Sequence, residues 1–153
     1  MGEVMGTEQT ESPLSETSPS VQGHLGILQS VIQRMASNST SCKAWCIAIV
    51  SAILVIVADK GNPNFAFIAF IPTFLFLALD AYYLALEKAF RASYTDFVKN
   101  LHSGVAKAED LYTIAPKGNH SKHQIQALKS FSVWGFYATL FLLIELARSV
   151  VLK

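Results

Sequence analysis

Charged residues are scarce in this sequence. Only 15% of its 153 residues are charged and 52% are hydrophobic, whereas a soluble domain is typically about 25% charged. This composition argues against an ordinary cytosolic enzyme. The 12 basic and 11 acidic residues nearly cancel, so the net charge gives no reason to expect direct nucleic-acid binding.

Cysteines and catalytic motifs are also scarce. The two cysteines, Cys42 and Cys46, are four residues apart, which favours two small buried side chains on one helix face. A metal site needs more ligands than this pair offers. We find no Gly-rich phosphate loop, no G-x-S-x-G, no H-E-x-x-H and no C-x-x-C. We therefore expect no enzyme activity, no catalytic residues, no metal and no cofactor.

The first twenty residues contain little that a core could bury. They are mostly Ser, Thr, Glu, Pro and Gly, and no Lys or Arg occurs before Arg34. Such a segment cannot offset the entropy lost on ordering. We expect residues 1–20 to be a disordered acidic tail, and they do not have the basic start and apolar core of a signal peptide.

Long uncharged runs dominate the rest of the chain. Residues 44–58 and 65–79 contain no charge, and each makes about 22 Å of helix. With their flanks they predict transmembrane spans at about 43–59 and 65–86. The alternative is a soluble bundle, but its helices would show one apolar stripe rather than an apolar circumference. The turn-forming residues 59–64 make the two spans an antiparallel hairpin.

A third uncharged run covers residues 130–144. We expect a third transmembrane helix at 125–153, after a cytoplasmic linker at 103–124. The predicted fold is therefore all-α and integral to the membrane: a long helical hairpin that extends into the cytoplasm, plus a third transmembrane helix. Basic residues precede the first span and outnumber acidic ones in 87–129. The N-terminus of this multi-pass protein is therefore expected in the cytoplasm.

The two hairpin helices are expected to continue beyond the membrane. Apolar residues recur at steps of three or four before the first span and after the second, which predicts one apolar stripe on each of two arms, 21–58 and 65–102. The stripes would pack on each other, or also form an oligomeric neck. The residues of the first stripe are Val21, Leu25, Leu28, Ile32 and Met35. Those of the second stripe are Leu86, Phe90, Tyr94, Phe97 and Leu101.

Few polar residues occur within the spans. The candidates for a pore or for intramembrane polar contacts are Glu145, Arg148, Ser51 and Thr73, although Glu145 and Arg148 could simply pair three residues apart. Pro72 should act as a hinge in the second span. Three spans cannot enclose a water-filled path, so any pore requires a homo-oligomer.

The segment that leaves the second span carries the most specific pattern. Residues 79–94 read LDAYYLALEKAFRASY, which is D-x-Y-Y-L followed by E-x-x-F-R-x-x-Y. The charged and aromatic side chains of this segment would couple the cytoplasmic helices to the membrane helices, with Glu87 and Arg91 paired four residues apart. The residues of this coupling segment are Asp80, Tyr82, Tyr83, Glu87, Phe90, Arg91 and Tyr94.

Over about residues 21–102 this chain resembles the SLATT family of small bacterial two-span membrane proteins. The resemblance implies an effector that forms a pore in the inner membrane when an upstream sensor of an anti-phage system is triggered. It also implies a sensor protein or a nucleotide second messenger as a candidate partner, besides the lipid bilayer and further copies of the chain. The alternative is a membrane anchor that recruits a cytoplasmic partner and conducts nothing.

Overall fold

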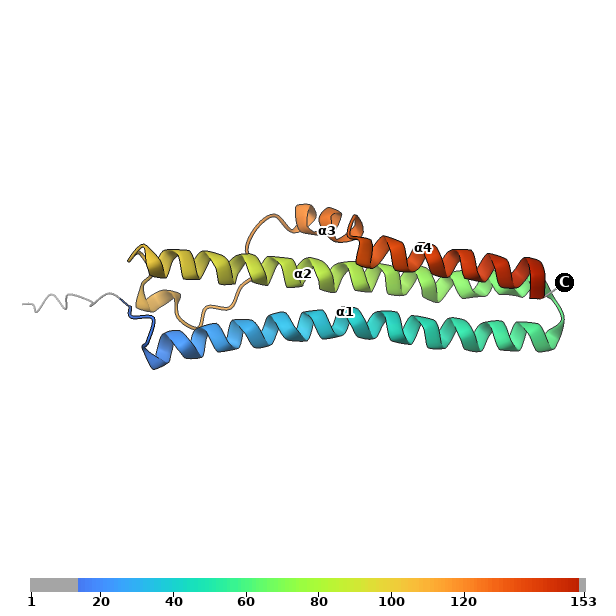
Figure 1. Cartoon of the computed structure of the whole chain (residues 1–153), viewed down its shortest axis with the longest axis horizontal. Helices are drawn as coiled ribbons and strands as arrows, with labels where there is room; N and C mark the ends of the chain where they lie inside the picture. The colour runs from blue at the N-terminus through green and yellow to red at the C-terminus, as the bar shows by residue number, and fades with distance from the viewer. Residues whose placement is uncertain (1–13, 152–153) are drawn as a thin grey trace, which may run out of the picture.

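The computed structural model describes residues 14–151, and the elements in this range are all helical (Figure 1). Three segments are long and apolar enough to cross a membrane: Pro19–Lys60, Pro63–His102 and Phe131–Ser149. An all-α chain with three such helices is what the sequence predicts, and this is confirmed. The elements are α1 (Pro19–Lys60), η1 (Pro63–Ala69), α2 (Phe70–His102), η2 (Ala108–Asp110), α3 (His120–Leu128), α4 (Phe131–Leu146) and η3 (Ala147–Val151).

The helix α1 is continuous over 42 residues, about 63 Å at 1.5 Å per residue. At its start the Ser18 hydroxyl accepts a hydrogen bond from the Val21 N–H at 3.3 Å, and Pro19 occupies the first turn, where its missing N–H is harmless. At its end Gly61 adopts φ 65° and donates its N–H to the Val57 and Ala58 carbonyls. Only glycine takes this left-handed conformation without strain, so the hairpin turn begins here.

The segment before α1 differs from the expected disordered tail. The helix begins at Pro19, and Glu16 pairs with His102 at 3.1 Å. Leu14 packs against a buried cluster at the far end of α2. The low average hydrophobicity of residues 1–20 concealed this one apolar anchor and the helix cap that follows it. Residues 1–13 of the expected tail lie outside the described residues.

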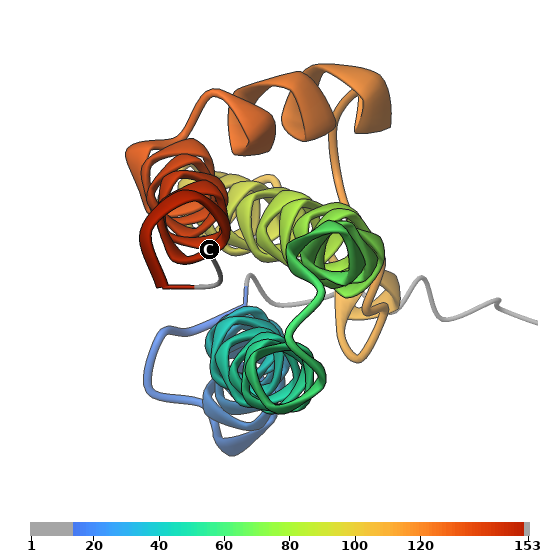
Figure 2. The same cartoon turned by 90° about the vertical axis from the view of Figure 1, so that its right-hand side faces the viewer.

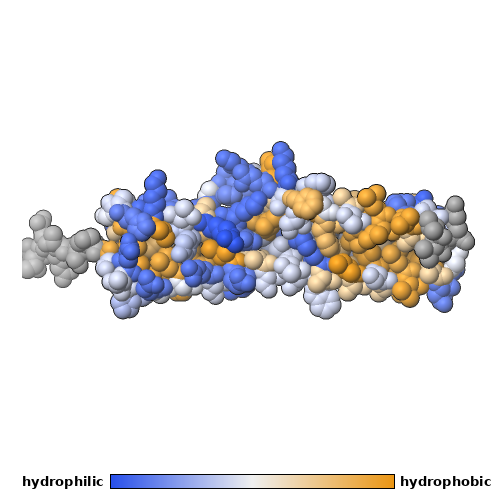
Figure 3. All heavy atoms as spheres, in the orientation of Figure 1, coloured by the Kyte–Doolittle hydropathy of each residue, from blue (hydrophilic) through white to orange (hydrophobic). Residues whose placement is uncertain are grey.

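Helices α1 and α2 run antiparallel along the length of the molecule, and α4 lies beside the half of α2 that is nearer the hairpin turn (Figures 1 and 2). Figure 3 shows hydrophobic surface concentrated in that half, whereas the opposite half is mainly hydrophilic. From here on, the arms are the parts of α1 and α2 in this hydrophilic half, outside the apolar runs. The chain therefore divides along its long axis into an apolar end with three helices and a polar end with two.

Small residues line the buried face of α2. Ala81, Ala85, Ala89 and Ser93 are all buried and occur every fourth residue, so neighbouring backbones can approach this face closely. The expected large stripe on the second arm is therefore only partly correct: Phe97 and Leu101 are buried, whereas Leu86, Phe90 and Tyr94 are half-buried. On α1 the residues Val21, Leu28 and Met35 are buried as the stripe predicts.

The third apolar run forms α4, but the helix expected over 125–153 is interrupted before that run. The helix α3 ends at Leu128, Ser130 has an extended backbone with ψ 133°, and α4 begins at Phe131. This corrects the expected single helix over 125–153, of which residues 152–153 lie outside the described range. Figure 2 shows α1, α2 and α4 end-on and α3 lying crosswise beside α2 and α4, on the side away from α1. The expected linker 103–124 contains η2 and the beginning of α3.

Candidate functional site

Asp80 is the centre of a buried polar cluster between α1 and α2. Its side chain is 0% exposed. The Ser39 hydroxyl donates to Asp80 Oδ1 at 2.5 Å, and the Lys43 ammonium lies 2.6 Å from Asp80 Oδ2. Lys43 Nζ also donates to Ser39 Oγ at 3.4 Å. One carboxylate thus holds two side chains of the opposite helix.

The sequence brings these groups together through helix spacing and hairpin register. Ser39 and Lys43 are four residues apart, so they share one face of α1. Lys43 is sixteen residues before Asp59, and Asp80 is sixteen residues after Asn64. Because the turn lies between Asp59 and Asn64, the antiparallel hairpin places Lys43 and Asp80 at the same level.

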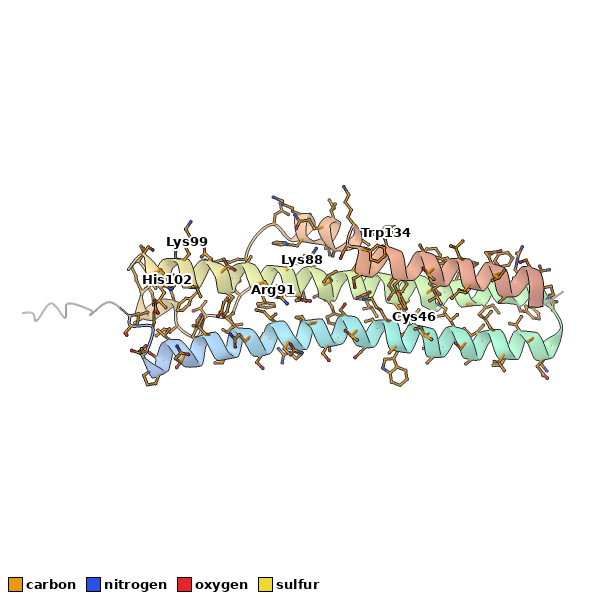
Figure 4. All side chains as sticks on the ribbon, viewed as in Figure 1. Cys46, Lys88, Arg91, Lys99, His102 and Trp134 are labelled. Carbon is orange, nitrogen blue, oxygen red and sulfur yellow. The ribbon has the colours of Figure 1, made fainter. Side chains whose placement is uncertain are left out.

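Helix α4 closes the cluster from a third side. Tyr137 is buried, and its hydroxyl lies near Asp80 and the thiols of Cys42 and Cys46 without a hydrogen bond of ordinary geometry. Thr73 is also buried, donates to the Ala69 carbonyl at 2.7 Å and interacts with the Cys46 thiol. Cys46 is labelled in Figure 4 and projects from α1 into this junction. Three helices therefore meet around one carboxylate.

The charge of Asp80 makes the packing of α1 on α2 depend on the polar partners of this side chain. An isolated buried carboxylate is strongly unfavourable, and an ion pair with hydrogen bonds offsets that penalty. Lys43 is the only cation that an ion pair places against Asp80 among the described residues. Removal of either partner therefore weakens the contact between α1 and α2 at this level. No group of three metal-ligating side chains gathers within residues 14–151.

The predicted coupling segment forms contacts of several kinds. Arg91 Nε donates to Glu87 Oε1 at 2.8 Å, as the spacing predicts. The rings of Tyr82 and Tyr83 make an edge contact at 5.6 Å. Further along α2, the Tyr94 hydroxyl accepts a hydrogen bond from Gln29 of α1 at 3.4 Å. The segment thus touches α1 at both of its ends, through Asp80 and Tyr94, while Phe90 is half-buried.

The predicted pore and hinge residues are not brought together. Glu145 and Arg148 form a partly buried pair with 3.4 Å between their charged groups, and Arg148 covers the Phe67 ring. Ser51 is exposed, whereas Thr73 is buried in the junction described above. Pro72 lies in the first turn of α2, directly after η1. A proline there removes no mid-helix hydrogen bond, so the expected kink within the span has no basis at this position.

Sequence reasoning missed a second cluster at the polar end. His24 is buried in α1, and its Nδ1 accepts a hydrogen bond from the Tyr112 N–H at 2.9 Å. Its ring also contacts Phe97 of α2 at 4.3 Å. Tyr112 has φ 63°, and its side chain lies next to Gly23 of α1. Burial lowers the pKa of His24, and the Asp110 carboxylate opposes that shift.

The chain after Tyr112 is fixed to α2 mainly through Ser93 and Asp96. Ser93 Oγ donates to the Ala115 carbonyl at 2.7 Å and accepts from the Lys117 N–H at 3.0 Å. The Lys117 ammonium is paired with Asp96, and this contact holds the pKa of Asp96 below its usual value. Residues 103–119 are therefore a docked segment rather than a loose linker.

Two open grooves flank these clusters. The first lies between the arms and has a volume of about 530 Å³; it is lined by Gln29, Ile32, Gln33, Arg91, Tyr94 and Thr95. The second, of about 550 Å³, lies between α1 and α4 in the apolar half; it is lined by Lys43, Ile47, Phe131, Ser132, Gly135, Phe136, Thr139, Leu140 and Leu143. Lys43 thus belongs both to the ion pair and to a groove wall.

Comparisons with family models, with curated proteins and with solved structures found no match. The geometry and the residues themselves therefore carry the functional argument.

Proposed function

We propose that this chain is a multi-pass protein of the bacterial inner membrane that assembles into a homo-oligomeric, membrane-permeabilising pore. A sensor in an anti-phage system would trigger it, as the resemblance over residues 21–102 implies. The basic residues that flank the spans support a cytoplasmic location for the N-terminus and for residues 103–119. The three long apolar helices support insertion across the bilayer.

The observation that carries the proposal is the groove between α1 and α4, with the Lys43–Asp80 pair at its wall. No helix within residues 14–151 of a single copy fills this groove. Gly135 and Thr139 stand four residues apart on its α4 side, and small residues at this spacing allow a neighbouring transmembrane helix to approach closely. A helix of a second copy would therefore cover the groove, and Lys43 in the groove wall would then lie next to the interface between the two copies.

The depth of the ion pair fits a role at the inner mouth of such a pore. Along α1, Lys43 precedes Lys60 by about 25 Å, and a bilayer core is about 30 Å thick. The pair would thus lie just inside the cytoplasmic boundary. Its partner helices run without a break into the arms, since α1 starts at Pro19 and α2 ends at His102. A signal that moves the arms would act directly on this pair.

A larger side chain in the groove between α1 and α4 tests the proposal. We expect Thr139→Leu to prevent close approach of copies, which should abolish dye release from liposomes that contain the purified full-length chain and reduce intermolecular cross-linking. Ala138→Leu is the matched control, because Ala138 is exposed on α4 but does not line the groove. It should leave both measurements unchanged.

Cells provide the complementary experiment. The full-length chain would be expressed with the genes that neighbour it and then triggered, while a voltage-sensitive dye reports the membrane potential. Depolarisation before growth stops is the expected result. Cells that stop growing with an intact potential would contradict a pore.

The groove between the arms favours a second candidate function. It is open, polar and walled by both cytoplasmic arms, so it could receive a segment of another protein. In that case the chain is a non-conducting anchor that recruits a cytoplasmic partner. Co-purification of a stoichiometric partner with a single copy of this chain would support the anchor and exclude the homo-oligomeric pore.

A further inference from the structure

Helix α3 has an unusual position relative to the apolar helices. It lies crosswise to α1, α2 and α4 in the end view, at the level where α4 begins (Figures 1 and 2). At that level the surface changes from hydrophilic to hydrophobic (Figure 3). Lys88 of α2 donates to the Gln126 carbonyl at 3.1 Å, and Ala127 is fully buried. The inner face of α3 is therefore fixed against the bundle.

The outer side of this region exposes large apolar side chains. The rings of Phe131 and Trp134 make an edge contact at 5.4 Å, and Figure 4 labels Trp134 near the beginning of α4. Nothing in the described part of a single copy covers this patch. Its members and their exposed fractions are Ile125 55%, Leu128 46%, Phe131 75% and Trp134 53%.

Positive charge accompanies this apolar patch. Lys122 and Lys129 are exposed, and no salt bridge pairs either of them with a carboxylate among the described residues. The sequence contains no Asp or Glu between Asp110 and Glu145. The patch thus combines exposed apolar side chains with uncompensated cations, and nothing acidic interrupts it.

We propose that α3 and the first turn of α4 form an interfacial anchor that binds the headgroups of anionic phospholipids on the cytoplasmic leaflet. A helix that lies in the plane of the interface buries its apolar side chains at the acyl boundary, while its lysines meet the lipid phosphates. Each lysine near an anionic leaflet strengthens such binding electrostatically. This inference rests on the membrane insertion in the proposed function, but it requires neither a pore nor an oligomer.

Tryptophan fluorescence tests the anchor in the full-length chain. With Trp45→Phe, Trp134 is the only tryptophan, and the chain is placed in nanodiscs of phosphatidylcholine with increasing brominated phosphatidylglycerol. We expect strong quenching at a low anionic fraction. Lys122→Gln with Lys129→Gln should require an anionic fraction about tenfold higher for the same quenching. The matched control is Lys99→Gln with Lys107→Gln, two exposed lysines far from α3, and it should behave like the parent.

Each remaining outcome decides the question. Equal quenching by brominated phosphatidylcholine and phosphatidylglycerol, or an unchanged response of the Lys122/Lys129 variant, would overturn the anchor. Absence of any Trp134 quenching would point to a protein partner for the patch and would also overturn it. In the reciprocal variant, Trp134→Phe, Trp45 reports insertion of α1. Quenching of Trp45 alone therefore refutes the anchor and leaves the pore intact, while a failed dye-release assay leaves the anchor intact.

Discussion

Lys43 and Asp80 differ in how completely the helices cover them. The Lys43 side chain is 18% exposed, whereas the Asp80 side chain is 0% exposed. Without Asp80, the lysine can extend its ammonium toward water or headgroups. Without Lys43, the carboxylate remains enclosed with only Ser39 as a donor. Removal of Lys43 should therefore destabilise the protein more than removal of the Asp80 charge.

We expect Lys43→Met to lower the free energy of unfolding by about 3 kcal/mol, because it leaves a buried charge unpaired. Asp80→Asn should lower it by only about 1 kcal/mol. Detergent unfolding of the full-length chain, titrated with dodecyl sulfate, measures both. Lys60→Met is the control, since Lys60 is exposed at the other end of α1. Equal losses for the two variants would show that Lys43 does not relocate.

The residues of this site were only partly predictable from the sequence. The Glu87–Arg91 pair follows from helix spacing alone. The Lys43–Asp80 pair could have been predicted from equal distances to the turn, because hairpin register is a local property. Tyr137 could not, since its approach depends on how α4 docks. His24 also escaped prediction, because the segment that buries it is irregular and has no periodicity.

At the scale of elements, the docking of residues 103–119 depends on a neutral histidine. His24 can accept the hydrogen bond of the Tyr112 N–H only when Nδ1 carries no proton. Burial lowers the pKa of His24 below the usual 6.5. The released state then binds more protons than the docked state, so docking is at full strength above pH 6.5 and weakens as the pH falls below it.

Hydrogen exchange should reveal this dependence. After correction for intrinsic rates, we expect the Tyr112 amide to exchange faster at about pH 5 than at about pH 8, the range over which histidine titrates. The variant His24→Asn keeps a hydrogen-bond acceptor but does not titrate. The protection of the Tyr112 amide in this variant should therefore not change with pH. Equal protection of the parent chain at both pH values would show that Asp110, which faces His24, keeps the contact intact.

The elements illustrate where sequence patterns are sufficient. Runs without charge identify α1, α2 and α4, because a helix that is apolar all round has few alternatives to a membrane. The break between α3 and α4 gave no such signal, since Lys129 and Ser130 are compatible with a helix. Its cause is tertiary, as α3 packs against α2 through Ala127 and Lys88.

At the scale of the whole molecule, the proposed orientation has a direct consequence for accessibility. The hairpin turn and residues 103–119 stand at opposite ends of a long bundle. We expect Asp59→Cys to react with a membrane-impermeant maleimide in intact spheroplasts, and Lys107→Cys to react only after permeabilisation. Both positions are exposed. Labelling uses a background with Cys42→Ala and Cys46→Ala.

The control is the same pair of variants after detergent solubilisation, where both should react fully. Labelling of Lys107→Cys alone in spheroplasts would invert the proposed topology, and labelling of neither would place both ends on the inside.

The overall hairpin was predictable from the matched lengths of the two arms. The groove between α1 and α4 was not, because it depends on α4 packing on α2 rather than on both helices.

The meeting of Val21 with Leu101 at the free ends of the arms dictates an order of assembly. These residues lie at opposite ends of the hairpin sequence, so their contact can form only after both arms and the turn between them have been synthesised. Leu111 and the docked segment join the same cluster still later in synthesis. Under the proposed topology, both arms lie on the same side of the membrane only after both spans have inserted, so closure of the arms would report complete insertion of the hairpin.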